Sequence, residues 1–283
     1  MRMKNMKLML VLATVTMTAV SCGNKKEKQG EETPKTLVLY YSQTGNTKAV
    51  AEEIANRLNA DIEALEAVKP YDGDFQATIE RCLREQEQGL PVEIQPISAN
   101  LADYDVIFLG YPVWFGTYAP PVATFLANVD LSGKKLVPFC TFGSGGLESS
   151  VKFLKEKQPD AEILPGYGVR AARMSAMPKE VDQFLKANGF LEGDYARLEE
   201  FPEQHPVSEA EAAVFNAAVD GYPMLHAQAK TVALRALPEG TEYLFTAVDL
   251  PRENNPKIPT AGEIQVYVML VEGEAPVFTK VVR

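Results

Sequence analysis

The chain has few of the residues from which metal centres and thiol sites are built. Only His205 and His226 are present among its 283 residues, so a centre that needs several histidine ligands is excluded. Neither histidine has neighbouring ligand residues, and both are interpreted as structural. The 3 cysteines, Cys22, Cys82 and Cys140, are too few for a disulfide framework or a cysteine-rich zinc site.

Basic residues are also in short supply. Lys and Arg number 28 against 38 Asp and Glu, which gives a formal net charge of −10. An acidic chain without basic clusters repels a phosphate backbone, so the composition argues against nucleic acid as a partner. Apolar residues make up 46% of the chain, which excludes wholesale disorder and predicts globular domains.

The first residues have the pattern of a targeting segment. Three basic residues precede an apolar run at 8–20, which is shorter than the ~20 residues that span a bilayer. The run ends in small residues before Cys22, which resembles the lipobox of bacterial lipoproteins and implies lipidation of Cys22. We therefore expect a signal peptide over residues 1–21 and a lipid anchor in the bacterial cell envelope. An ordinary signal peptide with an incidental cysteine, or an uncleaved anchor, is the alternative.

Composition divides the rest of the chain into four segments. Residues 22–35 are polar without apolar periodicity, so we expect a flexible tether there. Residues 36–191 form the first expected domain. Glycine and proline interrupt any regular element at 192–205, which is interpreted as a linker. Residues 206–283 form a second, smaller domain.

Short apolar runs alternate with helical periodicity along residues 36–191. Strands are expected at 36–41, 61–68, 105–110, 135–142 and 161–169. Helices are expected at 47–58, 74–88, 121–129, 147–157 and 178–188. This alternation predicts an α/β fold, with a doubly wound five-stranded parallel sheet covered by helices on both faces. In such sheets, ligands bind beyond the carboxyl ends of the strands.

A cluster of hydroxyl residues around a glycine follows the first expected strand. We call residues 42–47 (Ser42-Gln43-Thr44-Gly45-Asn46-Thr47) the first loop. At a helix start, free backbone N–H groups and the positive end of the helix dipole attract anions, so the first loop predicts an anion pocket. No lysine follows in the pattern of triphosphate-binding loops, so a nucleoside triphosphate is not indicated. Capping of the helix by Ser42 or Thr44 is the alternative.

Two further unusual segments follow the third and fourth expected strands. The second loop, residues 110–118, contains the only Trp of the chain, Trp114, with three other aromatic residues. It could form a flat wall for a planar ring, or a hydrophobic staple for the next helix. The third loop, residues 141–146, is rich in glycine and could surround a ring edge with N–H groups, or be a flexible turn. All three loops are expected at one end of one sheet.

These three loops resemble those of flavodoxins, specifically the short-chain flavodoxin-like proteins. The first loop matches the family's FMN phosphate loop, residues 109–116 resemble the loop beside the isoalloxazine ring, and residues 141–145 resemble the third loop, although Phe142 replaces a small residue. The resemblance implies a strand order 2-1-3-4-5 and noncovalent FMN. The cofactor-binding residues that it implies are Ser42, Gln43, Thr44, Gly45, Asn46, Thr47, Pro112, Val113, Trp114, Phe115, Gly116, Thr141, Phe142, Gly143, Ser144 and Gly145.

The resemblance also implies a redox function. The protein is expected to be an electron carrier or an FMN-dependent reductase, with a redox partner protein or a small quinone-like acceptor. No serine–histidine set or paired carboxylate indicates a competing chemistry. A flavodoxin-shaped interaction lipoprotein without cofactor is the alternative.

The second domain has a different pattern. Residues 208–219 are amphipathic, with Ser208 and Glu211 spaced as in a capping box. Strand-like runs follow at 231–237, 242–249, 263–272 and 277–282. A helix followed by a four-stranded antiparallel sheet is an α+β arrangement, and it loosely resembles the cystatin-like fold. We expect this domain to dock another protein.

Overall fold

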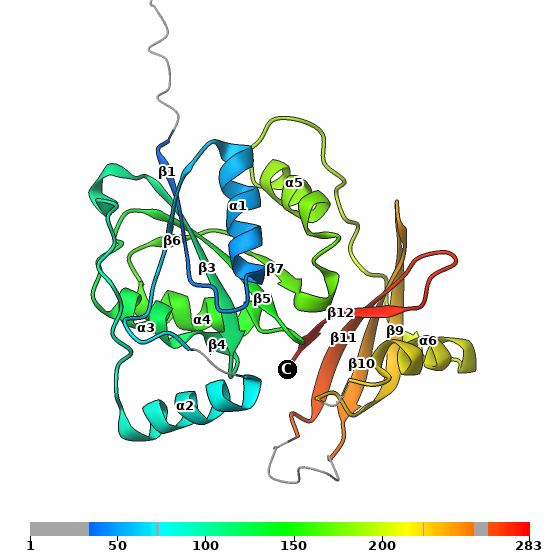
Figure 1. The fold of residues 1–283 in the computed structure, drawn as a ribbon. Helices are drawn as coiled ribbons and strands as arrows, with labels where there is room; N and C mark the ends of the chain where they lie inside the picture. The colour runs from blue at the N-terminus through cyan, green and yellow to red at the C-terminus, as the bar shows by residue number, and fades with distance from the viewer. Residues whose placement is uncertain (1–33, 72–73, 223, 252–259) are drawn as a thin grey trace, which may run out of the picture. The chain divides into compact units, whose positions relative to one another are not determined.

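The structure is a computed structural model that describes residues 34–71, 74–222, 224–251 and 260–283 (Figure 1). These residues belong to one compact unit, Pro34–Arg283. The predicted signal peptide at 1–21, the predicted lipidation site Cys22 and the predicted tether up to residue 33 lie outside the described residues.

The first part of this unit is a parallel sheet with helices. Its strands are β1 (Thr36–Tyr40), β2 (Asp61–Ala64), β3 (Val106–Trp114), β4 (Thr117–Tyr118), β5 (Lys135–Phe142), β6 (Glu162–Ile163) and β7 (Tyr167–Arg170). Its helices are α1 (Asn46–Leu58), α2 (Phe75–Gln88), α3 (Pro120–Ala127), α4 (Leu147–Lys157) and α5 (Met177–Ala187), with short 3-10 turns at η1 (Leu101–Asp103) and η2 (Ala171–Arg173). The order is β2-β1-β3-β5, with β6 and β7 both parallel to β5. This confirms the predicted α/β fold and the order 2-1-3-4-5.

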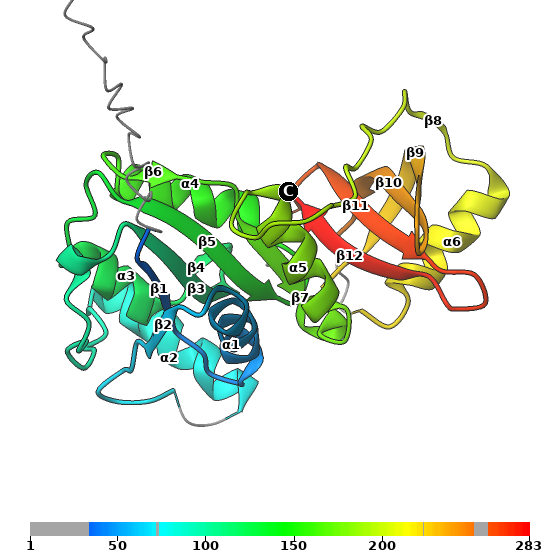
Figure 2. The ribbon, with the colours of Figure 1, turned by 90° about the horizontal axis from the view of Figure 1, so that it is seen from above.

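The central strands β1, β3 and β5 are buried on both faces because they are apolar at nearly every position. Alternate residues of β1 face opposite sides: Leu37 and Leu39 pack with α3 and α4, whereas Val38 and Tyr40 pack with α1 and α5. Figure 2 shows α1 and α5 on one side of the sheet and α3 and α4 on the other. Two cores therefore hold the sheet between two layers of helices.

Three strands of the parallel sheet differ from their predicted bounds by more than one residue. β3 continues beyond Gly110 to Trp114, because the chain turns into β4 and forms a hairpin instead of an open loop. β2 stops at Ala64, because the chain leaves β1 and Ala67 bridges to Ile94. The fifth predicted strand is two strands, β6 and β7, because Pro165 between them lacks the N–H that a ladder needs.

The second part of the unit is an antiparallel sheet with one helix. The elements are β8 (His205–Pro206), α6 (Glu209–Val219), β9 (Ala227–Leu237), β10 (Gly240–Asp249), β11 (Glu263–Leu270) and β12 (Val277–Val282). The order is β12-β11-β10-β9-β8, so the sheet has 5 strands where four were predicted. β8 was missed because two residues show no periodicity. The predicted capping box is confirmed: Ser208 and Glu211 each bond the other's backbone N–H.

The segment before β8 lies against this sheet. The Arg235 guanidinium donates to the Glu199 carbonyl at 2.6 Å and lies 4.3 Å from the ring centre of Phe201. The Gln204 side chain accepts hydrogen bonds from the hydroxyls of Thr231 and Thr246. The second half of the predicted linker is thus in contact with the C-terminal sheet.

Candidate functional site

The carboxyl ends of three neighbouring strands bring the three loops to one edge of the parallel sheet. Tyr40 of β1 pairs with Gly110 of β3, and Pro112 of β3 pairs with Thr141 of β5. Because the strands are parallel, the loops that follow them emerge side by side. The sequence-predicted loops therefore lie together.

The first loop leads into α1 at a helix start that no described side chain caps. Gly45 is the N-cap residue at φ 91°, a left-handed conformation that favours glycine, and no side chain caps the helix. Among the described residues, the N–H groups of Asn46, Thr47 and Lys48 have no acceptor, as expected of a first helical turn without a capping side chain. Ser42 Oγ instead accepts the N–H of Gly45 at 3.2 Å. The capping alternative is thus not what the structure shows.

The side chains of the first loop point in different directions. Thr44 is exposed and its hydroxyl has no partner among the described residues. Thr47 is buried, and its hydroxyl lies 2.8 Å from that of Thr141, which ties the first loop to the third. Gln43 Nε2 donates to the Tyr71 carbonyl and to the Thr78 hydroxyl, so the Gln43 amide faces away from the helix N-terminus. Thr44 and the free N–H groups are left to meet a ligand.

The second loop is a hairpin that presents aromatic rings. Phe115 at φ 52° and Gly116 at φ 80° form the turn between β3 and β4, and the Phe115 side chain is 54% exposed. Trp114 is half-buried and packs edge-on against Tyr41 and Tyr71, with ring centres 5.9 and 5.1 Å apart. These contacts hold the indole in one orientation. They also pack Trp114 against the core, through two residues that lie outside the helix that follows the loop.

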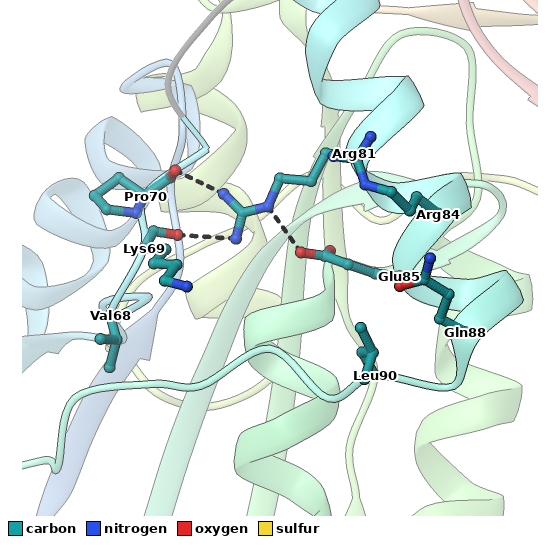
Figure 3. A pocket seen from close by; sticks show the side chains of 8 residues that line it. All are labelled: Val68, Lys69, Pro70, Arg81, Arg84, Glu85, Gln88 and Leu90. Carbon is teal, nitrogen blue, oxygen red and sulfur yellow. Dashed lines mark hydrogen bonds and ion pairs between the residues drawn. The ribbon is translucent and has the colours of Figure 1, made fainter.

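Tyr71 is a supporting residue that the sequence did not indicate. The Arg81 guanidinium lies 3.9 Å from its ring centre, and its hydroxyl donates to Glu85 at 2.5 Å. Burial and this bond raise the pKa of Tyr71 well above its usual value. Arg81 also donates to Glu85 and to the carbonyls of Lys69 and Pro70, as Figure 3 shows.

This cluster borders a surface cavity of about 570 Å³ that is not the predicted site. The cavity lies between α2 and the segment after β2, and three of Arg81's donors are already used by protein groups. Arg81 and Glu85 therefore serve to brace Tyr71, whose ring packs against Trp114. None of the three loops lines it.

The third loop is packed against the second. Val113 lies so close to Gly146 that a side chain at 146 would collide with it, and Ser149 Oγ donates to the Gly116 carbonyl at 2.6 Å. Phe142 is buried in the core at 5% exposure, so only its backbone lies at the loop. The loop thus offers backbone groups rather than side chains.

The remaining reactive side chains are placed for structure. Cys140 and Cys82 are free and buried, and burial raises the pKa of both thiols, which makes them poor nucleophiles. His205 Nε2 contacts Glu211 at 2.9 Å, and His226 Nδ1 contacts the Pro251 carbonyl at 2.8 Å.

Comparison with known proteins decides the family. A family model described as Flavodoxin matches residues 35–183, more than half of the chain. The chain belongs to the flavodoxin family. This flavodoxin-family chain has its first, second and third loops inside the matched region.

Curated relatives of the flavodoxin-family chain include two quinone-linked enzymes. It is 31% identical over 125 residues to an NAD(P)H dehydrogenase (quinone) of Paracoccus denitrificans, and 36% identical over 128 residues to NAD(P)H dehydrogenase (quinone) 3 of Rhizobium meliloti. Each match covers 41% of this chain, and it spans 59% and 58% of the respective relative. A solved flavoprotein in complex with FMN from Lactobacillus acidophilus is 28% identical, with a TM-score of 0.43, over 48% of this chain and 93% of that one.

The site of this flavodoxin-family chain fits FMN. A phosphate needs several donors at close range, which the Gly45-capped helix start and the Thr44 hydroxyl offer. A planar ring needs aromatic and backbone surfaces, which Trp114, Phe115 and the third loop offer at the same edge. Family and geometry together identify FMN as the cofactor.

Proposed function

We propose that this chain is an FMN-dependent oxidoreductase or electron carrier whose cofactor lies across the three loops. The single observation that carries the proposal is the start of α1: Gly45 caps the helix without a side chain, and three successive N–H groups lack partners among the described residues. A capping side chain would have bonded one of these groups. A helix start without a capping side chain leaves its N–H groups available to an anion.

The first loop would hold the phosphate. The N–H groups of Asn46, Thr47 and Lys48 and the hydroxyl of Thr44 are donors, and the helix dipole adds attraction for a negative group. Ser42 holds the loop shape by accepting the Gly45 N–H. These residues bind and orient; none of them is required to move a proton.

The second and third loops would hold the ring. Trp114 is braced by Tyr41 and Tyr71, so its position is set before a ligand arrives. The exposed Phe115 adds a second aromatic surface at the hairpin turn. Bound flavin supplies the electron transfer, while the chain excludes water from one face and sets the local charge.

The electron partners are inferred from the relatives. Both curated relatives are named as NAD(P)H dehydrogenases that use quinone, and this chain spans somewhat more than half of their length. Reduction of a quinone-like acceptor is therefore our proposal for the reaction, and transfer to a redox protein is the carrier form of the same chemistry. Steady-state oxidation of NADH and NADPH by the FMN-loaded protein, with and without benzoquinone, separates the two.

The cofactor itself is tested by titration. The protein stripped of flavin is titrated with FMN and with riboflavin, and the fluorescence of Trp114 is followed. FMN should quench it and bind more tightly than riboflavin, because riboflavin lacks the phosphate. Equal affinity for the two ligands would mean that the α1 start is not the phosphate site.

Location in the cell envelope is a separate part of the proposal, and it rests on the small residues before Cys22. No helix among the described residues is long and apolar enough to cross a membrane. A lipid on Cys22 would hold the flavin domain near membrane quinones. A lipid-anchored reductase and its quinone acceptor would then share one surface.

A further inference from the structure

The C-terminal sheet reaches the third loop. Val281 of β12 donates its backbone N–H to the Ser144 carbonyl. The Val281 carbonyl lies so close to Gly145 that any Cβ at 145 would overlap it. β12 is the edge strand of its sheet, so the third loop occupies hydrogen-bonding capacity that would otherwise be exposed.

Arg170 joins the same two parts of the chain. It ends β7, and its Nε donates to the Gly143 carbonyl at 2.9 Å, while its Nη1 donates to the Phe278 carbonyl of β12 at 3.2 Å. Its guanidinium also lies 3.5 Å from the ring centre of Phe278 and 5.1 Å from that of Tyr222. Two consecutive carbonyls of the third loop, at 143 and 144, are therefore held from one side.

Side chains next to these hydrogen bonds add to the contact between the third loop and the C-terminal sheet. Lys280 Nζ pairs with Glu148 in the first turn of α4 at 2.8 Å. The Tyr222 hydroxyl lies 2.9 Å from the position that a Cβ on Gly143 would take. The contact is thus built from backbone, charged and aromatic groups together.

Peptide geometry connects this contact with the cofactor. In a trans peptide, the carbonyl of one residue and the N–H of the next point in opposite directions. Fixing the carbonyls of Gly143 and Ser144 toward Arg170 and β12 therefore points the N–H groups of Ser144 and Gly145 away from them. Among the described residues, neither N–H has an acceptor. They are two oriented donors that no described group of the protein accepts from.

We propose that the C-terminal part of the chain is a structural component of the flavin site, in which Arg170 and Val281 fix the third loop so that two backbone N–H groups face the ring. The proposal rests on the proposed function, because it takes FMN as the ligand. Arg170 acts as a positioning residue: it contacts the loop and not the cofactor.

The first test replaces Arg170 by Met, which keeps an apolar stem and removes the donors. Affinity for FMN and for riboflavin should fall by the same factor, roughly five- to 150-fold for two misaligned neutral hydrogen bonds. The midpoint potential of the bound flavin should become more negative, because N–H donors favour the electron-rich reduced ring. The matched control is Arg173→Met, since Arg173 lies three residues further on and pairs with Glu180.

A second variant tests the same proposal in case Arg170→Met does not fold. Val281→Pro deletes the N–H that bonds Ser144, at an edge strand where proline is tolerated, and it is compared with Val281→Ala because the Val281 side chain is 2% exposed and belongs to the core of this sheet. It should lower both affinities in the same direction while thermal unfolding remains cooperative. In 15N-labelled wild type, the amide signals of Ser144 and Gly145 should shift on adding FMN, and these shifts should shrink in both variants.

The outcomes separate this proposal from the proposed function. If wild type binds FMN and both variants match it in affinity and potential, the positioning role is wrong and the FMN function stands. If wild type itself fails to bind FMN, the proposed function fails first. A loss confined to FMN, with riboflavin unchanged, would also overturn the positioning role, because it would place the effect at the phosphate.

Discussion

The hydroxyl pair Thr47 and Thr141 provides a direct test of how the site is held together. Their Oγ1 atoms are 2.8 Å apart, and the residues are 1% and 5% exposed. Replacing Thr47 by Val keeps the shape of the side chain and removes its hydroxyl. The buried hydroxyl of Thr141 then loses its hydrogen-bond partner. Such an unsatisfied group costs about 1–3 kcal/mol of unfolding free energy.

Two further variants provide a reference for the loss of unfolding free energy in Thr47→Val. Thr141→Val should cost a similar amount, for the same reason. The double variant replaces both hydroxyls with methyl groups of the same shape, and should be less destabilised than the sum of the two single variants. Chemical denaturation of all four proteins, with the slope checked for constancy, measures the coupling.

The wild type, the two single variants and the double variant also test how the site binds FMN. Because this hydrogen bond ties the first loop to the third, the single variants should weaken FMN as well as stability. Additive losses in the double variant, with no coupling between the two sites, would refute the reasoning. The loops would then be held together by strand pairing alone.

Four other predictions follow from individual side chains. Thr44→Ala should weaken FMN by about 1.5–3 kcal/mol and leave riboflavin unchanged, as measured by titration, because the exposed hydroxyl would bond a charged phosphate. Trp114→Ala should weaken FMN roughly five- to 150-fold; a loss of thermal stability alone would instead assign it to packing. Glu211→Ala should cost about 1 kcal/mol at pH 7. The bonds from Ser208 lower the pKa of Glu211 to about 2, so this cost should shrink as pH falls from about 4.5 to 2 in pH-resolved unfolding. Cys22→Ser should move the protein from the membrane to the soluble fraction, and unchanged membrane association would refute lipidation.

The parallel sheet could be predicted from the sequence because its signals are local. Runs such as 37–40 are apolar and buried throughout, as expected of a strand covered on both faces, and the helices between them keep one apolar face. The rule that ligand loops follow the carboxyl ends of parallel strands then predicts that the three loops lie together. The prediction of a loop at Trp114 was wrong for a local reason. Trp114 belongs to β3, because a two-residue turn follows it and pairs β3 with β4.

The contacts that brace the site could not be predicted in the same way. Arg81 lies ten residues from Tyr71 and meets its ring only because α2 packs beside that segment. Arg170 and Val281 both contact the third loop, and Val281 is more than a hundred residues away from it in the sequence. A single sequence has no periodicity that reports such a meeting. The supporting residues of this site are therefore visible only in three dimensions.

The absorbance spectrum of the purified protein tests the central claim most directly. The protein is incubated with FMN, freed of unbound ligand on a desalting column, and scanned across the visible range. The account predicts a yellow protein with the flavin bands retained at about one FMN per chain. A preparation that leaves the column colourless would contradict it.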